Sequence, residues 1–185
     1  MPLTIALRLL ISSVYLFILC STGIGQTSPG VNQAKVADGD SIESIILKIR
    51  KEYTQIVADS AKYQLASKDV MGMSTEGGEL IYYHEGKLLR KASLTIFGET
   101  GRSVTEYYFA DGKIFFCYER ITRYDKPFYL ENMHVKKVEE NRYYFNDQQL
   151  IRWLDSSRKI IAGKLYAAKG KELLAEWKEA NKVAE

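Results

Sequence analysis

The sequence predicts an α+β domain in which an N-terminal amphipathic helix and a C-terminal helix flank an antiparallel β-meander of three repeated hairpins. Three observations predict this fold: a helical stripe of apolar residues after residue 40, a second one after residue 164, and an eight-residue hairpin pattern that occurs three times between them. We divide the chain into a signal peptide at 1–25, a flexible leader at 26–39 and a single α+β domain at 40–185.

The first 25 residues have the features of a cleavable secretory signal. Arg8 is the one charged residue between positions 3 and 25, an apolar run covers residues 9–19, and small residues follow up to Gly25. A membrane-spanning helix needs about 20 apolar residues, more than this Ser-interrupted run supplies. We therefore expect cleavage after Gly25, a periplasmic or secreted location, and no membrane span afterwards. A retained anchor is an alternative, and so is lipoprotein processing at Cys20, although Leu19 stands where a lipobox needs a small side chain.

Composition argues against several kinds of partner and chemistry. The net charge is +3, and removal of Arg8 with the signal lowers it to about +2, which is too balanced for a nucleic-acid partner. Cys117 is the one cysteine left after cleavage, so no intramolecular disulfide can form. The sequence has no HxxxH, CxxC or clustered Asp motif, so we expect no metal site and no cofactor.

Two helices are predicted at the ends of the domain. The first covers residues 41–60, with Asp40 and Glu43 at the spacing of a capping pair. Its apolar stripe consists of Ile42, Ile45, Ile46, Ile49, Tyr53, Ile56 and Val57. The second covers residues 164–182, where the residues at helical spacing are Tyr166, Leu173, Trp177, Ala180 and Ala184.

Between the helices, a region rich in strand signals begins at residues 70–78 and contains an internal repeat. Segments 82–89, 108–115 and 144–151 each place two aromatic residues and a spacer before an acidic residue, usually Gly, a polar residue and two apolar residues. Asp-Gly between apolar runs predicts a hairpin, because a type I′ turn needs positive φ at both central positions. We therefore expect hairpin tips near 85–86, 111–112 and 147–148, in a meander of about 6–7 strands.

The expected register divides the strand residues between two faces. With two-residue turns, residue 83 pairs with 88, 109 with 114 and 145 with 150, and side chains then alternate along each strand. One face is expected to be a core made of Ile81, Tyr83, Leu88, Ala92, Leu94, Ile96, Tyr107, Phe109, Ile114, Phe116, Tyr118, Tyr143, Phe145, Leu150 and Leu154.

The opposite face is expected to carry polar residues together with an apolar stripe. The stripe consists of three cross-strand pairs, Tyr82 with Leu89, Tyr108 with Phe115, and Tyr144 with Ile151. An exposed stripe of this size is typical of an interface or a binding groove, so these six residues are the candidate ligand-binding residues. Two arrangements remain open: one helix covers each face, or both helices cover one face and leave the stripe to a partner.

Other candidate residues have weaker patterns. His84 is expected at the first hairpin tip, exposed, and Cys117 is expected on the mixed face, where it could pair with His134. Residues 120–127 are expected to be a solvated link that could contact a polar ligand. The acidic residues near the sheet are Glu99, Glu106, Glu119, Glu139 and Glu140, and nothing in the sequence selects a catalytic pair among them. No catalytic residue is therefore assigned.

Segments 82–89, 108–115 and 144–151 resemble the MORN-type repeats of bacterial secreted proteins, whose units also place an aromatic pair before an acidic-Gly-Lys-aliphatic hairpin. The resemblance covers about eight residues per unit, the spacing between units is irregular, and the third unit lacks the Gly. The chain also resembles small exported proteins of unknown function from Gram-negative bacteria. Neither resemblance implies an activity or a set of functional residues.

The function expected from these patterns is that of an exported, non-catalytic binding or interaction module of the cell envelope. Its partner is expected to be a protein, a peptide or an envelope ligand held on the mixed face of the sheet. Two alternatives stay open: a secreted hydrolase that uses carboxylates on the sheet or loops, and a purely structural envelope protein whose stripe is covered by its own helices.

Overall fold

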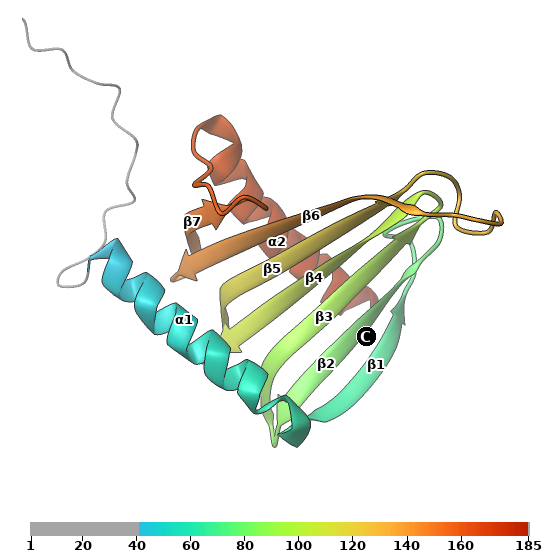
Figure 1. Ribbon diagram of the computed structural model, residues 1–185. Helices are drawn as coiled ribbons and strands as arrows, with labels where there is room; N and C mark the ends of the chain where they lie inside the picture. Colours follow the sequence, from blue (N-terminus) through green and yellow to red (C-terminus); the bar gives the residue numbers. More distant parts are fainter. Residues whose placement is uncertain (1–40, 185) are drawn as a thin grey trace, which may run out of the picture. The chain divides into compact units, whose positions relative to one another are not determined.

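Seven antiparallel strands form one sheet, with one α-helix before it in the chain and one after it (Figure 1). The computed structural model describes residues 41–184, so the predicted signal peptide at 1–25, the leader at 26–39, Cys20 and Asp40 lie outside the described residues. The elements are α1 (Ile42–Ala58), the 3-10 helix η1 (Ser60–Lys62), β1 (Gln64–Val70), β2 (Gly78–Glu85), β3 (Leu88–Gly98), β4 (Gly101–Ala110), β5 (Lys113–Tyr124), β6 (Val135–Asn146), β7 (Gln149–Leu154) and α2 (Lys164–Val183).

The strands follow chain order across the sheet, from β1 at one edge to β7 at the other. The predicted antiparallel sheet between two helices is thus confirmed. Strand β1 was missed, because the strand region was expected to begin only at residues 70–78. Six of the seven residues of β1 are exposed, so this edge strand lacks the apolar alternation that marks a half-buried strand. Residues 120–124, expected to be part of a link, instead continue strand β5.

Helix α1 begins and ends close to the predicted positions. Its N-cap is Ser41, whose hydroxyl accepts a hydrogen bond from the backbone N–H of Ser44 at 3.3 Å. The cap therefore lies one residue after the predicted Asp40. The helix ends at Ala58 rather than at residue 60, because residues 60–62 tighten into a 3-10 turn. Helix α2 ends one residue beyond its predicted limit.

The two helices cover opposite faces of the sheet (Figure 1). The face called here the α2 face buries Ala92, Leu94, Tyr107, Phe109, Ile114, Cys117, Tyr143, Phe145 and Leu150 against Leu173 and Ala180 of α2. The face called here the α1 face buries Tyr108, Phe116, Tyr144 and Leu154 against Ile46, Ile49 and Ile56 of α1. Of the two arrangements left open by the sequence, one helix per face is the one observed.

Two of the three predicted hairpin tips lie at the expected residues. Asp111 and Gly112 have φ of 50° and 71°, and Asp147 and Gln148 have φ of 45° and 62°, as a type I′ turn requires. The first tip is Gly86-Lys87 rather than residues 85–86, because Glu85 pairs with Leu88. Gly86 then supplies a positive φ at the first central position of the turn. His84 consequently lies inside β2 and is half-buried rather than exposed at a tip.

Each hairpin contains a β-bulge, so the observed register differs from the expected one. Phe109 pairs with Ile114 and Phe145 with Leu150 as predicted, but Tyr108 then pairs with Phe116 and Tyr144 with Arg152. In the first hairpin, His84 pairs with Leu89 and Tyr83 with Lys91. The residues left without a cross-strand partner are Arg90, Phe115 and Ile151.

Each extra residue reverses the alternation of side chains beyond it. The residues expected on one core face are therefore divided between the two faces. Tyr83, Phe116, Tyr118 and Leu154 belong to the α1 face instead of joining Tyr107, Phe109 and Tyr143.

Within residues 41–184, no helix combines the length and the apolar character that crossing a membrane requires.

Candidate functional site

A row of aromatic and cationic side chains crosses the α1 face. From β7 to β2, the residues that pair in register are Arg152, Tyr144, Phe116, Tyr108, Lys91 and Tyr83, called here the aromatic row. The ring of Phe116 lies 5.1 Å from that of Tyr144 and 5.6 Å from that of Tyr108. The Lys91 Nζ stands 4.9 Å and 5.6 Å from the ring centres of Tyr83 and Tyr108. Cation–π and edge-to-face contacts therefore join most of the row.

Helix α1 packs on this row through Tyr53 and Arg50. The Tyr53 ring lies edge-on to Tyr108 and to Phe116, with its centroid 5.0 Å from each. One turn earlier, the Arg50 guanidinium stands 5.9 Å from the ring centre of Tyr144. These contacts place the polar ends of two long side chains of α1 above the sheet.

Two ion pairs also tie α1 to the sheet. The Arg152 Nη1 donates to a carboxylate oxygen of Glu43 at 3.0 Å, near the start of the helix. The Arg90 Nη2 donates to Glu52 at 2.6 Å, nearer its end. The hydrogen bond from Arg152 lowers the pKa of Glu43, so this pair stays charged at neutral pH. The bulge residue Arg90 can reach the helix because the extra residue turns it to the α1 face.

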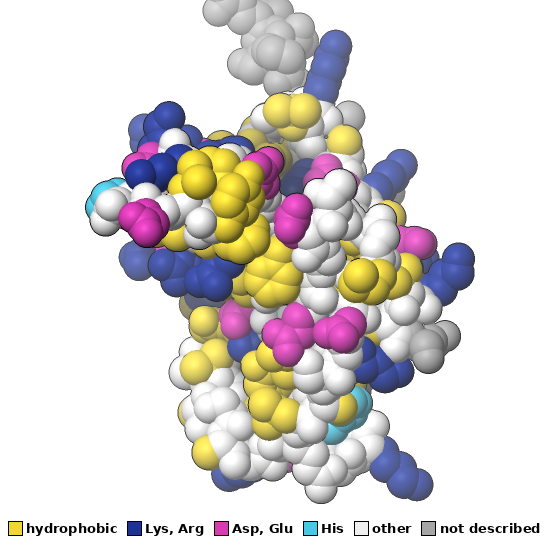
Figure 2. Space-filling model, turned by 90° about the vertical axis from the view of Figure 1, so that its right-hand side faces the viewer, with side chains coloured by type: hydrophobic (Ala, Val, Ile, Leu, Met, Phe, Trp, Pro, Cys, Tyr) yellow, Lys and Arg dark blue, Asp and Glu magenta, His cyan; other side chains and the backbone are white. Residues whose placement is uncertain are grey.

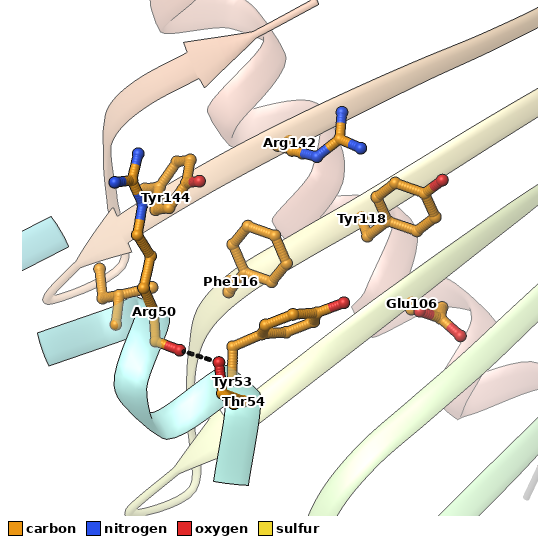
Figure 3. A pocket seen from close by; sticks show the side chains of 9 residues that line it. Arg50, Tyr53, Thr54, Glu106, Phe116, Tyr118, Arg142 and Tyr144 are labelled. Carbon is orange, nitrogen blue, oxygen red and sulfur yellow. Dashed lines mark hydrogen bonds between the residues drawn. The ribbon is translucent and has the colours of Figure 1, made fainter. Parts of the chain in front are cut away.

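A cavity of about 480 Å³ lies beside these contacts, between α1 and the sheet (Figure 3). Its lining residues are Ile49, Arg50, Tyr53, Thr54, Glu106, Phe116, Tyr118, Arg142 and Tyr144. They come from α1 and from strands β4, β5 and β6. The volume falls within the range of about 300–1,000 Å³ that is typical of small-molecule sites.

The sheet contributes polar lining residues from the next row of paired residues. Arg142 pairs with Tyr118, and Tyr118 pairs with Glu106. The Arg142 guanidinium carbon lies 5.2 Å from the ring centre of Tyr118, and its Nη2 donates to Glu140 at 3.1 Å. Among residues 41–184, no group accepts a hydrogen bond from Nη1 of Arg142, although this atom is buried. The cavity thus has aromatic walls and a charged side that includes Arg142, whose Nη1 is buried without an acceptor among the described residues.

Glu106, the acidic residue of the lining, is neutralised by its neighbours. Its two carboxylate oxygens accept hydrogen bonds from the Lys91 Nζ at 2.5 Å and from the Tyr108 hydroxyl at 2.7 Å. Burial raises the pKa of Tyr108 far above its ordinary value, so this hydroxyl remains a donor. Burial also raises the pKa of Tyr118 to about 12, and the Tyr118 hydroxyl lowers the pKa of Glu140.

The structure does not bring the six predicted ligand-binding residues together as one stripe. Tyr82 and Leu89 lie on the α2 face, and the Tyr82 hydroxyl donates to Asn181 of α2 at 3.1 Å. The other four, Tyr108, Phe115, Tyr144 and Ile151, lie on the α1 face.

The three predicted cross-strand pairs are wrong, because Tyr82 pairs with Ala92 and the bulges shift the other two. Helix α1 covers much of the remaining stripe, since Tyr108 is 1% exposed and Tyr144 is 5% exposed. Tyr144 is the one predicted residue that lines the cavity.

Cys117 and the histidines take separate positions. Cys117 is buried on the α2 face rather than on the mixed face, and burial raises the pKa of its thiol well above the usual value. His134 lies in the exposed loop between β5 and β6, with its backbone N–H bonded to Asp125. His84 stacks on Tyr82, with 6.1 Å between ring centres. Cys117 and His134, which could have paired by sequence alone, thus lie in different parts of the fold.

A buried polar cluster joins α2 to the sheet. One Glu119 carboxylate oxygen accepts hydrogen bonds from the Tyr143 hydroxyl at 2.7 Å and from the Asn141 amide at 2.9 Å, and the other accepts one from the Lys169 Nζ at 3.1 Å. Glu176 accepts a hydrogen bond from the Tyr107 hydroxyl at 2.5 Å, and burial raises the pKa of Glu176 above its usual range. This cluster lies between packed elements, and its hydrogen bonds satisfy the polar groups that the helix covers.

The remaining predicted carboxylates lie apart from the cavity. Glu99 accepts a hydrogen bond from the Tyr129 hydroxyl in the loop region, and Glu139 forms ion pairs with Lys137 and Arg123. In the part of the chain that the structure describes, no three His, Cys, Asp or Glu side chains are grouped as a metal would require.

Hydrophobic side chains also gather at the loop end of the strands (Figure 2). Phe128, Tyr129 and Leu130 in the loop between β5 and β6 are 50%, 63% and 47% exposed, and Phe97 of β3 is 39% exposed. Residues 120–127 were expected to supply the loop contact, but these apolar residues follow them in the sequence. None of these four residues lines the cavity beside α1, so the patch is a separate surface feature.

Local patterns in the sequence do not group Tyr53, Phe116, Tyr118 and Glu106 into one site, and they do not single out Arg50 or Arg142. Tyr53 lay on the predicted helix stripe, and Phe116 and Tyr118 were assigned to the same strand face as Phe109. The bulge places these two residues on the α1 face, where Tyr53 packs on Phe116. Charged residues next to aromatic residues on one strand, as at Arg142 and Tyr144, were the signal that could have indicated the site.

The fold and the cavity define an α+β domain that has one helix on each face of a meander sheet and a ligand-sized cavity beneath one helix. In comparisons with protein families, curated proteins and solved structures, no match to this chain was found.

Proposed function

We propose that this chain is an exported, non-catalytic binding module of the cell envelope and that its ligand enters the cavity beneath α1. The observation that supports this proposal is the cavity itself, with a volume of about 480 Å³. Four aromatic side chains line it together with two arginines, a threonine and a glutamate, so polar groups that could orient a ligand lie beside apolar walls. This proposal replaces the broad stripe with a smaller site on the same side of the sheet as Tyr108 and Tyr144.

The proposed location depends on residues 1–25, whose pattern is that of a secretory signal. After cleavage at Gly25, the domain would operate in the periplasm or outside the cell without an internal disulfide, since Cys117 would have no partner in the chain. Expression of the full chain should yield a periplasmic or secreted product whose N-terminus, read by mass spectrometry, lies within a few residues of Gln26. An intact N-terminus in the cytoplasm would contradict the proposed location.

We also infer that the three hairpins are copies of one unit of the MORN-like type. The bulges support this inference, because each one follows the turn by the same number of residues, at Arg90, Phe115 and Ile151. Phe115 and Ile151 are the last residues of their units, whereas Arg90 directly follows the first unit, because the first turn lies one residue later than expected. In each hairpin the bulge turns two successive side chains toward α1. A repeated bulge thereby builds the in-register aromatic row on which the helix rests.

The two alternative functions have less support. A hydrolase of the glycosidase type needs two carboxylates on either side of its substrate, whereas Glu106 is the one acidic residue among those that line the cavity. Its two oxygens are already bonded to Lys91 and Tyr108. A purely structural role accounts for the covered aromatic residues, but it gives no reason for a cavity beside them.

A cavity-blocking variant tests the proposed function. Thr54 is an exposed residue of α1 that lines the cavity, so Thr54→Trp should fill the entrance without changing the buried face of the helix. The matched control is Lys51→Trp, an exposed position of α1 that does not line the cavity. Both purified mature variants and the unaltered chain are incubated with a small-molecule extract of Gram-negative envelopes, and retained compounds are measured by mass spectrometry after gel filtration.

We expect the unaltered chain and Lys51→Trp to retain the same compound and Thr54→Trp to lose it. Retention of that compound by all three proteins would contradict the cavity as the binding site. Retention of no compound by the folded, unaltered chain would contradict small-molecule binding itself.

A further inference from the structure

We propose that the ligand of the α1 cavity is a small carboxylate with a planar, apolar body, held by Arg142 and by the surrounding rings. This inference rests on the proposed function and adds the chemical class of the ligand. It follows from three features of the cavity: the arrangement of its aromatic rings, the charge of its lining and the hydrogen bonds that occupy the carboxylate of Glu106.

The rings of the lining favour a planar, apolar body. Tyr53 and Tyr144 are both edge-on to Phe116, at 5.0 Å and 5.1 Å between ring centres, and Tyr118 lies two residues further along the same strand (Figure 3). Aromatic walls prefer edge-to-face and offset-stacked partners, which a flat ligand provides. An extended peptide would instead need unpaired backbone donors and acceptors, but β4, β5 and β6 are inner strands paired on both sides.

The charge of the lining favours an anion. The lining contains two guanidinium groups, those of Arg50 and Arg142, and one carboxylate, that of Glu106. In Figure 3, Arg50 stands next to Tyr144 and Arg142 lies toward Tyr118, with Phe116 between them. A ligand on the Phe116 ring therefore has a cation at either side.

Arg142 has unused capacity to bind an acceptor. Its Nη2 is bonded to Glu140, and its Nη1 is buried with no acceptor among the described residues. An unpaired buried donor is unfavourable, and a guanidinium can bind a carboxylate with two parallel hydrogen bonds. The Arg142 side chain is 23% exposed, so its guanidinium can turn within the cavity to meet such a group.

Glu106 neither repels an anion strongly nor attracts a cation. Its oxygens are each occupied, one by the ammonium of Lys91 and the other by the hydroxyl of Tyr108. A cationic ligand would have to displace Lys91, which also contacts two aromatic rings. The arrangement therefore selects a carboxylate over an amine of the same shape.

A matched pair of probes separates charge from shape. Binding of 1-naphthoate and of its neutral amide, 1-naphthamide, to the mature chain is measured by isothermal titration calorimetry. The unaltered protein is compared with Arg142→Gln, with Thr54→Trp and with the control Arg123→Gln, which removes an exposed arginine outside the cavity. Because Arg142 is partly buried, the exposed Arg50→Gln is measured as well, so the test does not depend on one variant folding.

We expect naphthoate to bind more tightly than naphthamide and Thr54→Trp to abolish the binding of naphthoate. Arg142→Gln should weaken naphthoate binding by about 10- to 100-fold, the range for loss of a charged hydrogen bond. Arg50→Gln should weaken it by about two- to fivefold, because this guanidinium is more exposed. Arg123→Gln should leave the affinity unchanged.

The other outcomes contradict the inference in distinguishable ways. Equal binding of both probes, abolished by Thr54→Trp, would overturn the carboxylate class but leave the proposed function in place. Binding of neither probe, while a compound from the envelope extract is retained in a Thr54-dependent manner, would do the same. Binding of naphthoate that Thr54→Trp does not change, or absence of both probe and extract binding, would overturn the carboxylate and the cavity together.

Discussion

Replacement of Tyr53 by Leu should weaken the attachment of α1 to the sheet. The change keeps a large apolar side chain but removes the ring that lies edge-on to Tyr108 and to Phe116, at 5.0 Å from each. An aromatic pair of this kind contributes about 0.5–1.5 kcal/mol beyond the area that it buries. Two pairs are lost, so we expect the free energy of unfolding to fall by about 1–3 kcal/mol.

Urea unfolding followed by circular dichroism measures this loss, with Lys51→Leu on the exposed side of α1 as the control. The control should change the free energy of unfolding by no more than about 0.5 kcal/mol. A double-mutant cycle of Tyr53→Leu with Phe116→Leu should give a coupling energy of about 0.5–1.5 kcal/mol. A loss at Tyr53 no greater than that of the control, together with zero coupling, would refute the account of how the helix is held.

Three further predictions concern α2 and the third hairpin. Burial raises the pKa of Glu176, so its stabilising effect is full below the unfolded pKa of 4.5 and is lost as the pH rises through the folded pKa. In urea unfolding, Glu176→Gln should have the same free energy of unfolding as the unaltered chain at pH 4 and a higher one at neutral pH. A difference that does not depend on pH would contradict this. In Gly170→Ala, the new Cβ would lie 2.8 Å from the Cβ of Leu150. Overpacking should cost about 1–3 kcal/mol, more than the gain in helix propensity of up to about 1 kcal/mol, so the melting temperature should fall. A rise in melting temperature would show that helix propensity alone decides. Gln148 has φ of 62° at the position where the second hairpin has Gly112. Gln148→Gly should therefore raise the free energy of unfolding by up to about 1 kcal/mol, and Gly112→Gln should lower it. The reverse order in urea unfolding would show that these turns do not limit stability.

The elements that depend on local patterns could be predicted from the sequence. Both helices begin and end within about two residues of the expected positions, because their apolar stripes persist over several turns. The tip at 111–112 follows from Asp111 and Gly112, which tolerate positive φ, whereas the tip at 147–148 follows from the repeat, because Gln148 does not favour positive φ. Strand β1 could not be predicted in this way, because an exposed edge strand needs no apolar alternation.

The register of the strands depends on the β-bulges, which local sequence patterns do not show. A bulge adds one residue without a distinctive residue type, and here the extra positions are as different as Arg90, Phe115 and Ile151. Each one reverses the alternation beyond it, so the predicted ligand-binding stripe was divided between the two faces. The cavity could not be predicted for the same reason, since its walls combine α1 with strand residues that the bulges turn toward it.

Backbone amide shifts measured by NMR, during titration of the mature chain with 1-naphthoate, test directly whether a small ligand occupies the cavity beneath α1. We expect the largest shifts at residues 49–54 of α1 and near Glu106, Phe116, Tyr118 and Arg142. Shifts concentrated at residues 128–130 and Phe97 would instead assign binding to the exposed hydrophobic patch at the loop end of the strands. That result would contradict the cavity as the site of function.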